Sequence, residues 1–178
     1  GGSGRPRSDT RYVMETFRTG GPLKTTGEIN WQVSEGAWVS DGNAAAVTEA
    51  PARLTGSSFG EGRRSVSITW RGSATGTNVE IPWTDAESWK FRIEDDSFTL
   101  SHEDGPESQV VATGPVPADW RDDPTLDFVV VGKTFSVVDG RTAIATATSA
   151  ATPTRSDFVL SADRTDVALD RVEVEVLR

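Results

Sequence analysis

Two tryptophans lie among charged residues in segments with no strand pattern, and they are the first candidates for contact with a ligand. Trp83 follows a proline and precedes Asp85 by two residues, and Trp120 precedes Asp122 by two residues. Sugar rings are generally bound by an aromatic ring against their apolar face and by polar groups at their hydroxyls. These four residues are therefore the predicted ligand-binding residues. The alternative is that both indoles plug loops and cap the core.

Acidic residues in turns are the candidates for a metal site. Calcium takes about six to eight oxygen ligands, which loops supply readily. The pairs Asp95-Asp96 and Glu103-Asp104 and the segment with Asp163 and Asp166 carry such oxygens, but none matches the EF-hand loop signature. Acidic residues are also ordinary in turns. The prediction is no obligatory cofactor, with calcium at Asp163 and Asp166 as the metal site to examine.

Catalytic chemistry finds little support among the remaining residues. His102 is the sole histidine, and it has no nearby serine or cysteine nucleophile motif, so a surface residue is favoured over a general acid or base. Glu173 and Glu175 share one face of a strand because they alternate with valines. A solvated strand face explains them better than a catalytic pair does.

Composition excludes several classes of partner. The formal net charge is -9, from 18 basic and 27 acidic residues, with no basic cluster, so binding to nucleic acid or to an anionic membrane surface is disfavoured. No apolar run is long enough for membrane insertion. The chain has no cysteine, which removes disulfides, thiolate nucleophiles and zinc-thiolate sites together.

Alternation of apolar and polar residues is the main structural signal. It is clear at positions 63–71, 89–101, 126–130 and 171–176, and turns are expected at Asp95-Asp96, Gly132 and Asp139-Gly140. About a dozen short strands at roughly 8 to 12 residue spacing indicate an all-β fold, an antiparallel sandwich or barrel. The prediction is one β-sandwich domain over residues 11–178, with residues 1–10 as a flexible linker or an expression remnant.

Trp31 and Trp38 are predicted core residues, as are Trp70 and Trp89, which alternate in register with other apolar residues. Turn residues separate the short strand-like runs around Trp31 and Trp38, which suggests one hairpin running into another. Asp41-Gly42 supplies a tight turn. Three further breaks are expected from the sequence. They are the end of a strand before Pro51, a loop over residues 102–106, and an interruption over residues 114–117.

The order of several short motifs resembles that of concanavalin A-like (laminin G-like) lectin/glucanase jelly-roll domains. The matching segments run through nearly the whole chain: Gly21-Pro22-Leu23, Thr25-Thr26-Gly27, Trp31-x-Val33-x-x-Gly36-x-Trp38, Gly42-Asn43-x-Ala45, Phe91-Arg92-Ile93, Ala112-Thr113-Gly114-Pro115, Phe135-Ser136-Val137, Asp139-Gly140-Arg141 and Asp170-Arg171-Val172-x-Val174. Such domains are common in the minor tail and receptor-binding proteins of bacteriophages. The resemblance implies two curved antiparallel sheets packed face to face, with the first and last strands adjacent.

The resemblance also implies where ligands bind and what the domain does. Lectin-type members bind glycans on the concave sheet or its rim loops, and some hold calcium there. Glycoside hydrolases of this fold carry a Glu-x-Asp-x-x-Glu strand, which this sequence lacks. The expected function is thus a non-catalytic carbohydrate- or cell-surface-binding module of a phage tail or other host-attachment protein, located in the virion tail or otherwise extracellular.

Partners follow from that expectation. They are a bacterial cell-surface glycan or other surface receptor and the other tail proteins, with a homo-oligomer such as a trimer open in the parent protein. Two alternatives from other classes stand beside it. One is a structural or oligomerising module of a tail fibre with no ligand of its own, and the other is a glycan-cleaving hydrolase.

Overall fold

The computed structural model describes residues 11–23, 29–57 and 63–177, so the predicted linker over residues 1–10 and the Thr25-Thr26-Gly27 motif lie outside the described residues. The described residues form strands β1 to β14 and one short 3-10 turn, η2. The bounds are β1 Arg11–Glu15, β2 Gly21–Pro22, β3 Asn30–Ser40, β4 Ala45–Ser57, β5 Arg63–Trp70, β6 Thr77–Pro82, β7 Glu87–Ile93, β8 Ser97–Asp104, β9 Glu107–Pro115, η2 Ala118–Arg121, β10 Thr125–Val131, β11 Thr134–Asp139, β12 Thr142–Thr148, β13 Asp157–Ala162 and β14 Ala168–Leu177. None of these described segments is a helix able to span a membrane.

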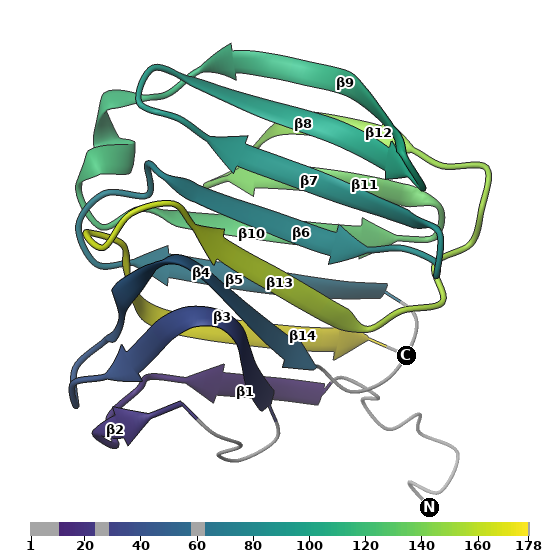
Figure 1. The fold of residues 1–178 in the computed structure, drawn as a ribbon. Helices are drawn as coiled ribbons and strands as arrows, with labels where there is room; N and C mark the ends of the chain where they lie inside the picture. The colour runs from purple at the N-terminus through teal and green to yellow at the C-terminus, as the bar shows by residue number, and fades with distance from the viewer. Residues whose placement is uncertain (1–10, 24–28, 58–62, 178) are drawn as a thin grey trace, which may run out of the picture.

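The strands form two layers packed face to face (Figure 1). The front sheet has the order β9-β8-β7-β6-β13-β4-β3-β2, and the back sheet has the order β12-β11-β10-β5-β14-β1. Every strand pairing is antiparallel. A short pairing of β14 with β4, through Ala168 with Ala46 and Leu169 with Ala45, joins the two sheets. The predicted all-β antiparallel sandwich is confirmed.

The first and last strands lie side by side, as the resemblance implied. β1 pairs with β14 from Arg11 opposite Val176 to Glu15 opposite Val172. Val172, Val174 and Val176 are fully buried, because the alternation of β14 directs them between the sheets. The described chain therefore starts and ends at the same end of the sandwich (Figure 1).

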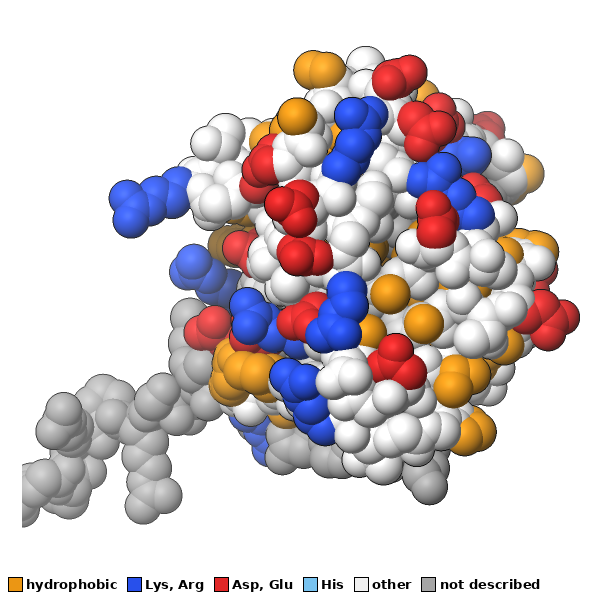
Figure 2. All heavy atoms as spheres, turned by 90° about the vertical axis from the view of Figure 1, so that its left-hand side faces the viewer, with side chains coloured by type: hydrophobic (Ala, Val, Ile, Leu, Met, Phe, Trp, Pro, Cys, Tyr) orange, Lys and Arg blue, Asp and Glu red, His pale blue; other side chains and the backbone are white. Residues whose placement is uncertain are grey.

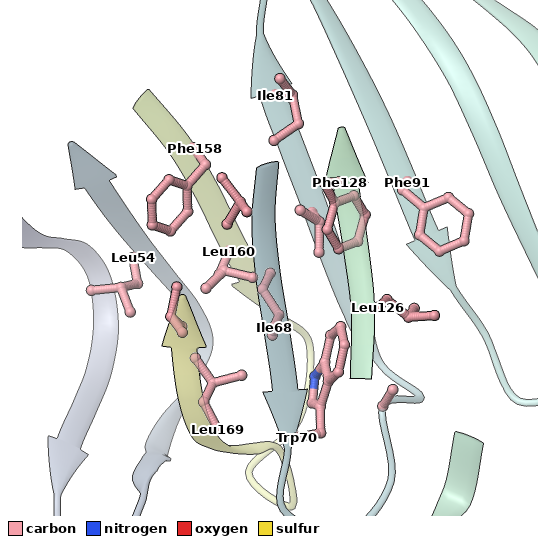
Figure 3. Close-up of a cluster of buried hydrophobic side chains, with 14 of the residues drawn as sticks. Leu54, Ile68, Trp70, Ile81, Phe91, Leu126, Phe128, Phe158, Leu160 and Leu169 are labelled. Atoms are coloured by element: carbon pink, nitrogen blue, oxygen red, sulfur yellow. The ribbon is translucent and has the colours of Figure 1, made fainter. Parts of the chain in front are cut away.

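The core fills the space between the sheets with large side chains from both layers. Figure 3 shows them projecting toward one another from the front strands (Leu54, Ile81, Phe91, Phe158, Leu160) and from the back strands (Ile68, Trp70, Leu126, Phe128, Leu169). Trp31, Trp38, Trp70 and Trp89 are all buried, so the four predicted core placements are confirmed. Burial of such apolar area is the main favourable contribution to the free energy of folding.

The expected hairpin between Trp31 and Trp38 is wrong, because both residues lie on the single strand β3. The pairing register between β3 and β4 shifts around Gly36, which has φ of 62°. Opposite it, β4 continues through Pro51 instead of ending there. Proline is tolerated in a strand at such a bulge, where ladder hydrogen bonds are already missing. The Asp41-Gly42 turn after β3 is confirmed, with Gly42 at φ of 91°.

Two further predicted breaks are shorter than expected. Residues His102 to Asp104 belong to β8, and the turn falls at Gly105, which has φ of 57°. β9 continues to Pro115 at the end of its pairing with β8. In both places pairing with a neighbouring strand extends the strand through residues whose local sequence favours a turn.

Candidate functional site

Trp83 is fully buried, so its predicted role as an exposed platform for a sugar ring is wrong. Its indole Nε1 donates a hydrogen bond of 2.8 Å to the carbonyl oxygen of Ala151. Its ring packs edge to face with the Trp89 ring, with centroids 6.0 Å apart. The neighbouring Asp85 is exposed, with a carboxylate oxygen 3.4 Å from a guanidinium nitrogen of Arg155. The predicted pair of aromatic ring and carboxylate is therefore not formed.

Trp120 is also fully buried and is not available to a ligand. It lies on η2 and packs against the rings of Phe98 and Phe91, with centroids 5.6 and 6.2 Å away. Its Nε1 donates a 2.8 Å hydrogen bond to Oδ2 of Asp139. Asp122 follows the turn on the surface. The alternative reading of both loop tryptophans, as plugs that cap the core, is the correct one.

Asp163 and Asp166 lie on the loop between β13 and β14, and each faces an arginine. Asp163 Oδ2 is 3.8 Å from a guanidinium nitrogen of Arg92, and Asp166 Oδ1 is 3.0 Å from Nε of Arg164. Across residues 11–23, 29–57 and 63–177, no three His, Asp or Glu side chains are placed to share a metal ion. Calcium binding at these two residues stays a prediction.

A cleft of about 590 Å³ opens at the end of the sandwich where β6 and β8 begin and β13 ends. We call it the Asn78 cleft. It is lined by Gly76, Asn78, Arg92, Ile93, Glu94, Asp95, Asp96, Ser97, Asp163 and Arg164. Figure 2 faces this end of the molecule and shows acidic and basic side chains interleaved on it. Of the six predicted site residues, Asp163 alone lines this cleft.

Asn78 is the unusual residue of the cleft. It points away from the core, because Thr77 and Val79 on either side of it are fully buried between the sheets. Nevertheless it is only 6% exposed, and its Oδ1 atom has no hydrogen-bond partner within the described chain. A buried carbonyl oxygen without a donor costs about 1 to 3 kcal/mol. Such a group in a folded protein calls for an explanation, and a binding role is one.

The charged side chains of the cleft are arranged as arginines between carboxylates. Arg92 Nε lies 2.8 Å from Glu94, and Arg92 also reaches Asp163. Arg164 lies 3.2 Å from Asp95 on one side and contacts Asp166 on the other. These side chains are substantially exposed, so the pairs add little to folding stability. Their arrangement instead sets the electrostatic potential at the mouth of the cleft.

The cleft continues onto the outer face of the front sheet as a row of polar side chains. Cross-strand pairing places Ser161 beside Asn78, Asn78 beside Arg92, and Arg92 beside Thr99. The next row carries Glu80 and Lys90, which also lie opposite each other on neighbouring strands. Neighbours in such a row have Cβ atoms about 4.5 to 5.5 Å apart, so they can contact one extended ligand together.

Sequence reasoning missed Asn78, Arg92 and Arg164 as site residues. Alternation alone puts Asn78 and Glu80 on one face of their strand and Lys90 and Arg92 on one face of theirs. The register between the strands decides that these faces meet, and no local pattern in the chain gives that register.

The opposite end of the sandwich holds a smaller polar cluster around His102. The centroids of its ring and of the Trp89 ring are 4.7 Å apart, and its Nε2 is 3.6 Å from a carboxylate oxygen of Glu87. The other oxygen of Glu87 accepts a hydrogen bond from the Ser149 hydroxyl at 3.2 Å. His102 is thus partly buried against the core, whereas the sequence predicted an ordinary surface residue.

The two sheets, their strand order and the adjacent first and last strands define a concanavalin A-like jelly roll. The comparisons with solved structures agree. The chain superposes on the CBM2 module of the evolved Dit of Lactobacillus casei BL23 phage J-1 with a TM-score of 0.64, at 12% identity, over 97% of this chain and 98% of that one.

Other similar structures include both a binding module and an enzyme. The endo-β-1,3(4)-glucanase SCLam of family GH16 matches with a TM-score of 0.68, at 8% identity, over 97% of this chain and 93% of that one. The carbohydrate-binding module CBM66 of Bacillus subtilis matches with a TM-score of 0.56, at 12% identity, over 79% of this chain and 91% of that one. At these identities the likeness establishes the fold alone. No family model and no curated protein matches the sequence.

Proposed function

We propose that this protein is a non-catalytic carbohydrate-binding module whose ligand lies on the outer face of the front sheet and is anchored in the Asn78 cleft. The observation that carries the proposal is the buried, unpaired Oδ1 of Asn78, a residue that lines the cleft. Arg92, its cross-strand neighbour, has a half-exposed side chain that lines the same cleft. A ligand hydroxyl group supplies the donor that the amide oxygen lacks.

A saccharide fits the surroundings of Asn78 because they are polar in every direction. The row Ser161, Asn78, Arg92 and Thr99 offers hydroxyl, amide and guanidinium groups to the many hydroxyls of a sugar. No large exposed apolar side chain of the described residues lines the cleft. Without an aromatic platform the affinity comes mainly from hydrogen bonds, and it should be low for a single site.

The exposed apolar residues are scattered over the surface, which argues against a purely structural docking module and favours ligand binding. In the described part of the chain the large ones are Tyr12 and Met14 on β1, Val110 and Val111 on β9, and Val131 on β10. β1 and β9 end different sheets, so these residues are dispersed and form no single docking patch. Hydrolysis gains no support either, since every Asp and Glu among the described residues is at least partly exposed to water.

The parent protein, in this proposal, is a phage tail or similar host-attachment protein that recognises a bacterial surface glycan. The likeness to the CBM2 module of a phage Dit, over nearly the full length of both chains, supports that setting. Display on an oligomeric tail, a trimer for example, compensates for a low affinity per site.

The test is binding of the labelled protein to a glycan array and to intact bacterial cells, with Asn78→Ala as the probe. The substitution should weaken binding about fivefold to tenfold, since one hydrogen bond to the ligand is lost. It should not lower the melting temperature, because the buried Oδ1 atom that it removes has no partner in the fold. Asn43→Ala, at an exposed asparagine of the β3–β4 turn, is the matched control and should bind as the wild type does.

Three results would contradict the proposal. Equal binding by the wild type and Asn78→Ala would move the site elsewhere. Absence of binding to every glycan and cell tested would favour the structural module. Release of reducing ends from a bound glycan would show that the protein is an enzyme.

A further inference from the structure

We infer that the Asn78 cleft selects saccharides that carry free amines, such as oligomers of glucosamine, over N-acetylated and acidic ones. The inference rests on the proposed function and adds the chemical class of the ligand. Three features of the cleft carry it: an excess of carboxylates, arginines that are already paired, and an amide oxygen in need of a donor.

The cleft holds more negative than positive charge. Four of its lining residues are carboxylates (Glu94, Asp95, Asp96 and Asp163), and two are arginines (Arg92 and Arg164). Extending the count to Arg121 and Asp166, which contact the lining residues, leaves the same excess of two carboxylates. A cationic ligand group is attracted to this site, and the net charge of -9 on the whole chain acts in the same direction.

Each arginine of the cleft already has two carboxylates at ion-pair distance, so an acidic sugar would meet negative charge beside either guanidinium, although Arg164 Nε makes no hydrogen bond within the described chain. Arg92 lies between Glu94 and Asp163, and Arg164 lies between Asp95 and Asp166. An incoming carboxylate would have to displace one of these partners and would add to the existing excess of negative charge. Acidic saccharides should therefore bind more weakly than neutral ones.

One carboxylate remains open to a ligand. The Asp96 side chain is 99% exposed, and its one ion-pair contact, with Arg121, is long at 4.0 Å. A protonated sugar amine has several N–H donors and no acceptor, so it matches both this carboxylate and the unpaired Oδ1 of Asn78. N-acetylation removes the charge and all but one of those donors. Charge-assisted hydrogen bonds are about twice as strong as neutral ones.

The experiment is isothermal titration of the whole protein with three hexasaccharides of matched length: glucosamine, N-acetylglucosamine and galacturonic acid. The glucosamine hexamer should bind about tenfold tighter than the N-acetylated one, and the galacturonic acid hexamer most weakly. Asp96→Asn should weaken binding of the glucosamine hexamer about threefold. Asp85→Asn is the matched control, because Asp85 is 97% exposed and lies outside the cleft.

Each other outcome overturns a specific statement. Equal affinity for the glucosamine and N-acetylglucosamine hexamers, both weakened by Asn78→Ala, would refute the amine selectivity and leave the proposed function standing. Equal losses in Asp96→Asn and Asp85→Asn would show diffuse attraction to an acidic protein and refute selection by the cleft. If none of the hexamers binds and the glycan array is also negative, the proposed function itself fails.

Discussion

Asp41 holds the turn between β3 and β4 through one carboxylate oxygen. Its Oδ1 accepts hydrogen bonds of 2.8 Å from the backbone N–H groups of Asn43 and Ala44. These two bonds hold the pKa of the Asp41 carboxyl below its ordinary value, because they favour the ionised form. The ionised carboxylate of Asp41 therefore adds to the stability of the turn at neutral pH.

Asp41→Ala should lower the melting temperature at pH 7, and the difference from the wild type should shrink in acid. A carboxyl with a depressed pKa in the folded state adds stability above its ordinary pKa of about 4, and that stability is lost as the pH falls through the folded value. Asp41→Asn should lose less than Asp41→Ala, since an amide oxygen can accept the same bonds. Thermal melts between pH 7 and acid measure this, and a difference independent of pH would contradict it.

Trp120, predicted as a ligand-binding residue, is a core residue, so its substitution should act on stability. Trp120→Ala should destabilise the protein by about 3 to 5 kcal/mol, because it empties a packed site between Phe91 and Phe98 and leaves Asp139 without its indole donor. Urea unfolding measures the change. Trp120→Phe should lose less, since it keeps part of the packing. An unchanged midpoint in both variants would place the ring outside the core.

At the scale of single strands, Gly36 allows β3 and β4 to cross their irregular stretch. A Cβ atom at this position would lie 2.3 Å from the carbonyl oxygen of Pro51 and 2.4 Å from that of Glu49. Gly36→Ala should therefore cost about 3 kcal/mol or more, from strain at positive φ together with the forced separation of the strands.

Gly105→Ala is the control for the backbone strain alone. Gly105 has a similar φ of 57°, and a Cβ there would meet nothing within 4 Å. Its substitution should cost only about 1 kcal/mol. Comparing the free energies of unfolding of the two variants separates the conformational cost from the steric one, and equal costs would show that β3 and β4 can move apart freely.

Strands with one buried face were predictable from the sequence because their alternation is imposed by the core itself. β5, β7, β8 and β14 follow the expected pattern, and the turns at Asp95-Asp96 and Asp139-Gly140 fall where the residue types demand. The single strand β3 was not predictable, since a glycine in a strand-like run fits a turn or a bulge equally well. The choice depends on what lies opposite it, here the carbonyl groups of β4.

The sequence indicated which types of residue could form a site, but it did not indicate which of them lie together in the structure. Charged neighbours made Trp83 and Trp120 look exposed, yet in a tight turn the neighbours face water while the ring faces inward. Conversely, Asn78 looked like an ordinary strand residue. Its importance comes from the register that sets it beside Arg92 and Ser161 and from the loop that brings Arg164 over the same cleft.

At the scale of the whole molecule, the cleft lies at one end of the sandwich, and the described chain starts and ends at the other. Arg11 pairs with Val176 where β1 begins and β14 ends, whereas the β7–β8 turn and the loop after β13 line the cleft at the far end (Figure 1). An attachment near Arg11 or Val176 would thus present the Asn78 cleft outward.

This arrangement predicts how the protein should respond to multivalent display. Four copies joined through their C-termini to a tetrameric carrier should bind a glycan-coated surface about a hundredfold or more tighter than the monomer, because each further contact is intramolecular. Surface plasmon resonance on one glycan density measures both forms. A tetramer carrying Asn78→Ala should lose more than the monomer carrying it, since the loss at each site multiplies over the sites engaged. A tetramer that binds no tighter than the monomer would show that the clefts cannot reach one surface together, and the outward presentation would then be wrong.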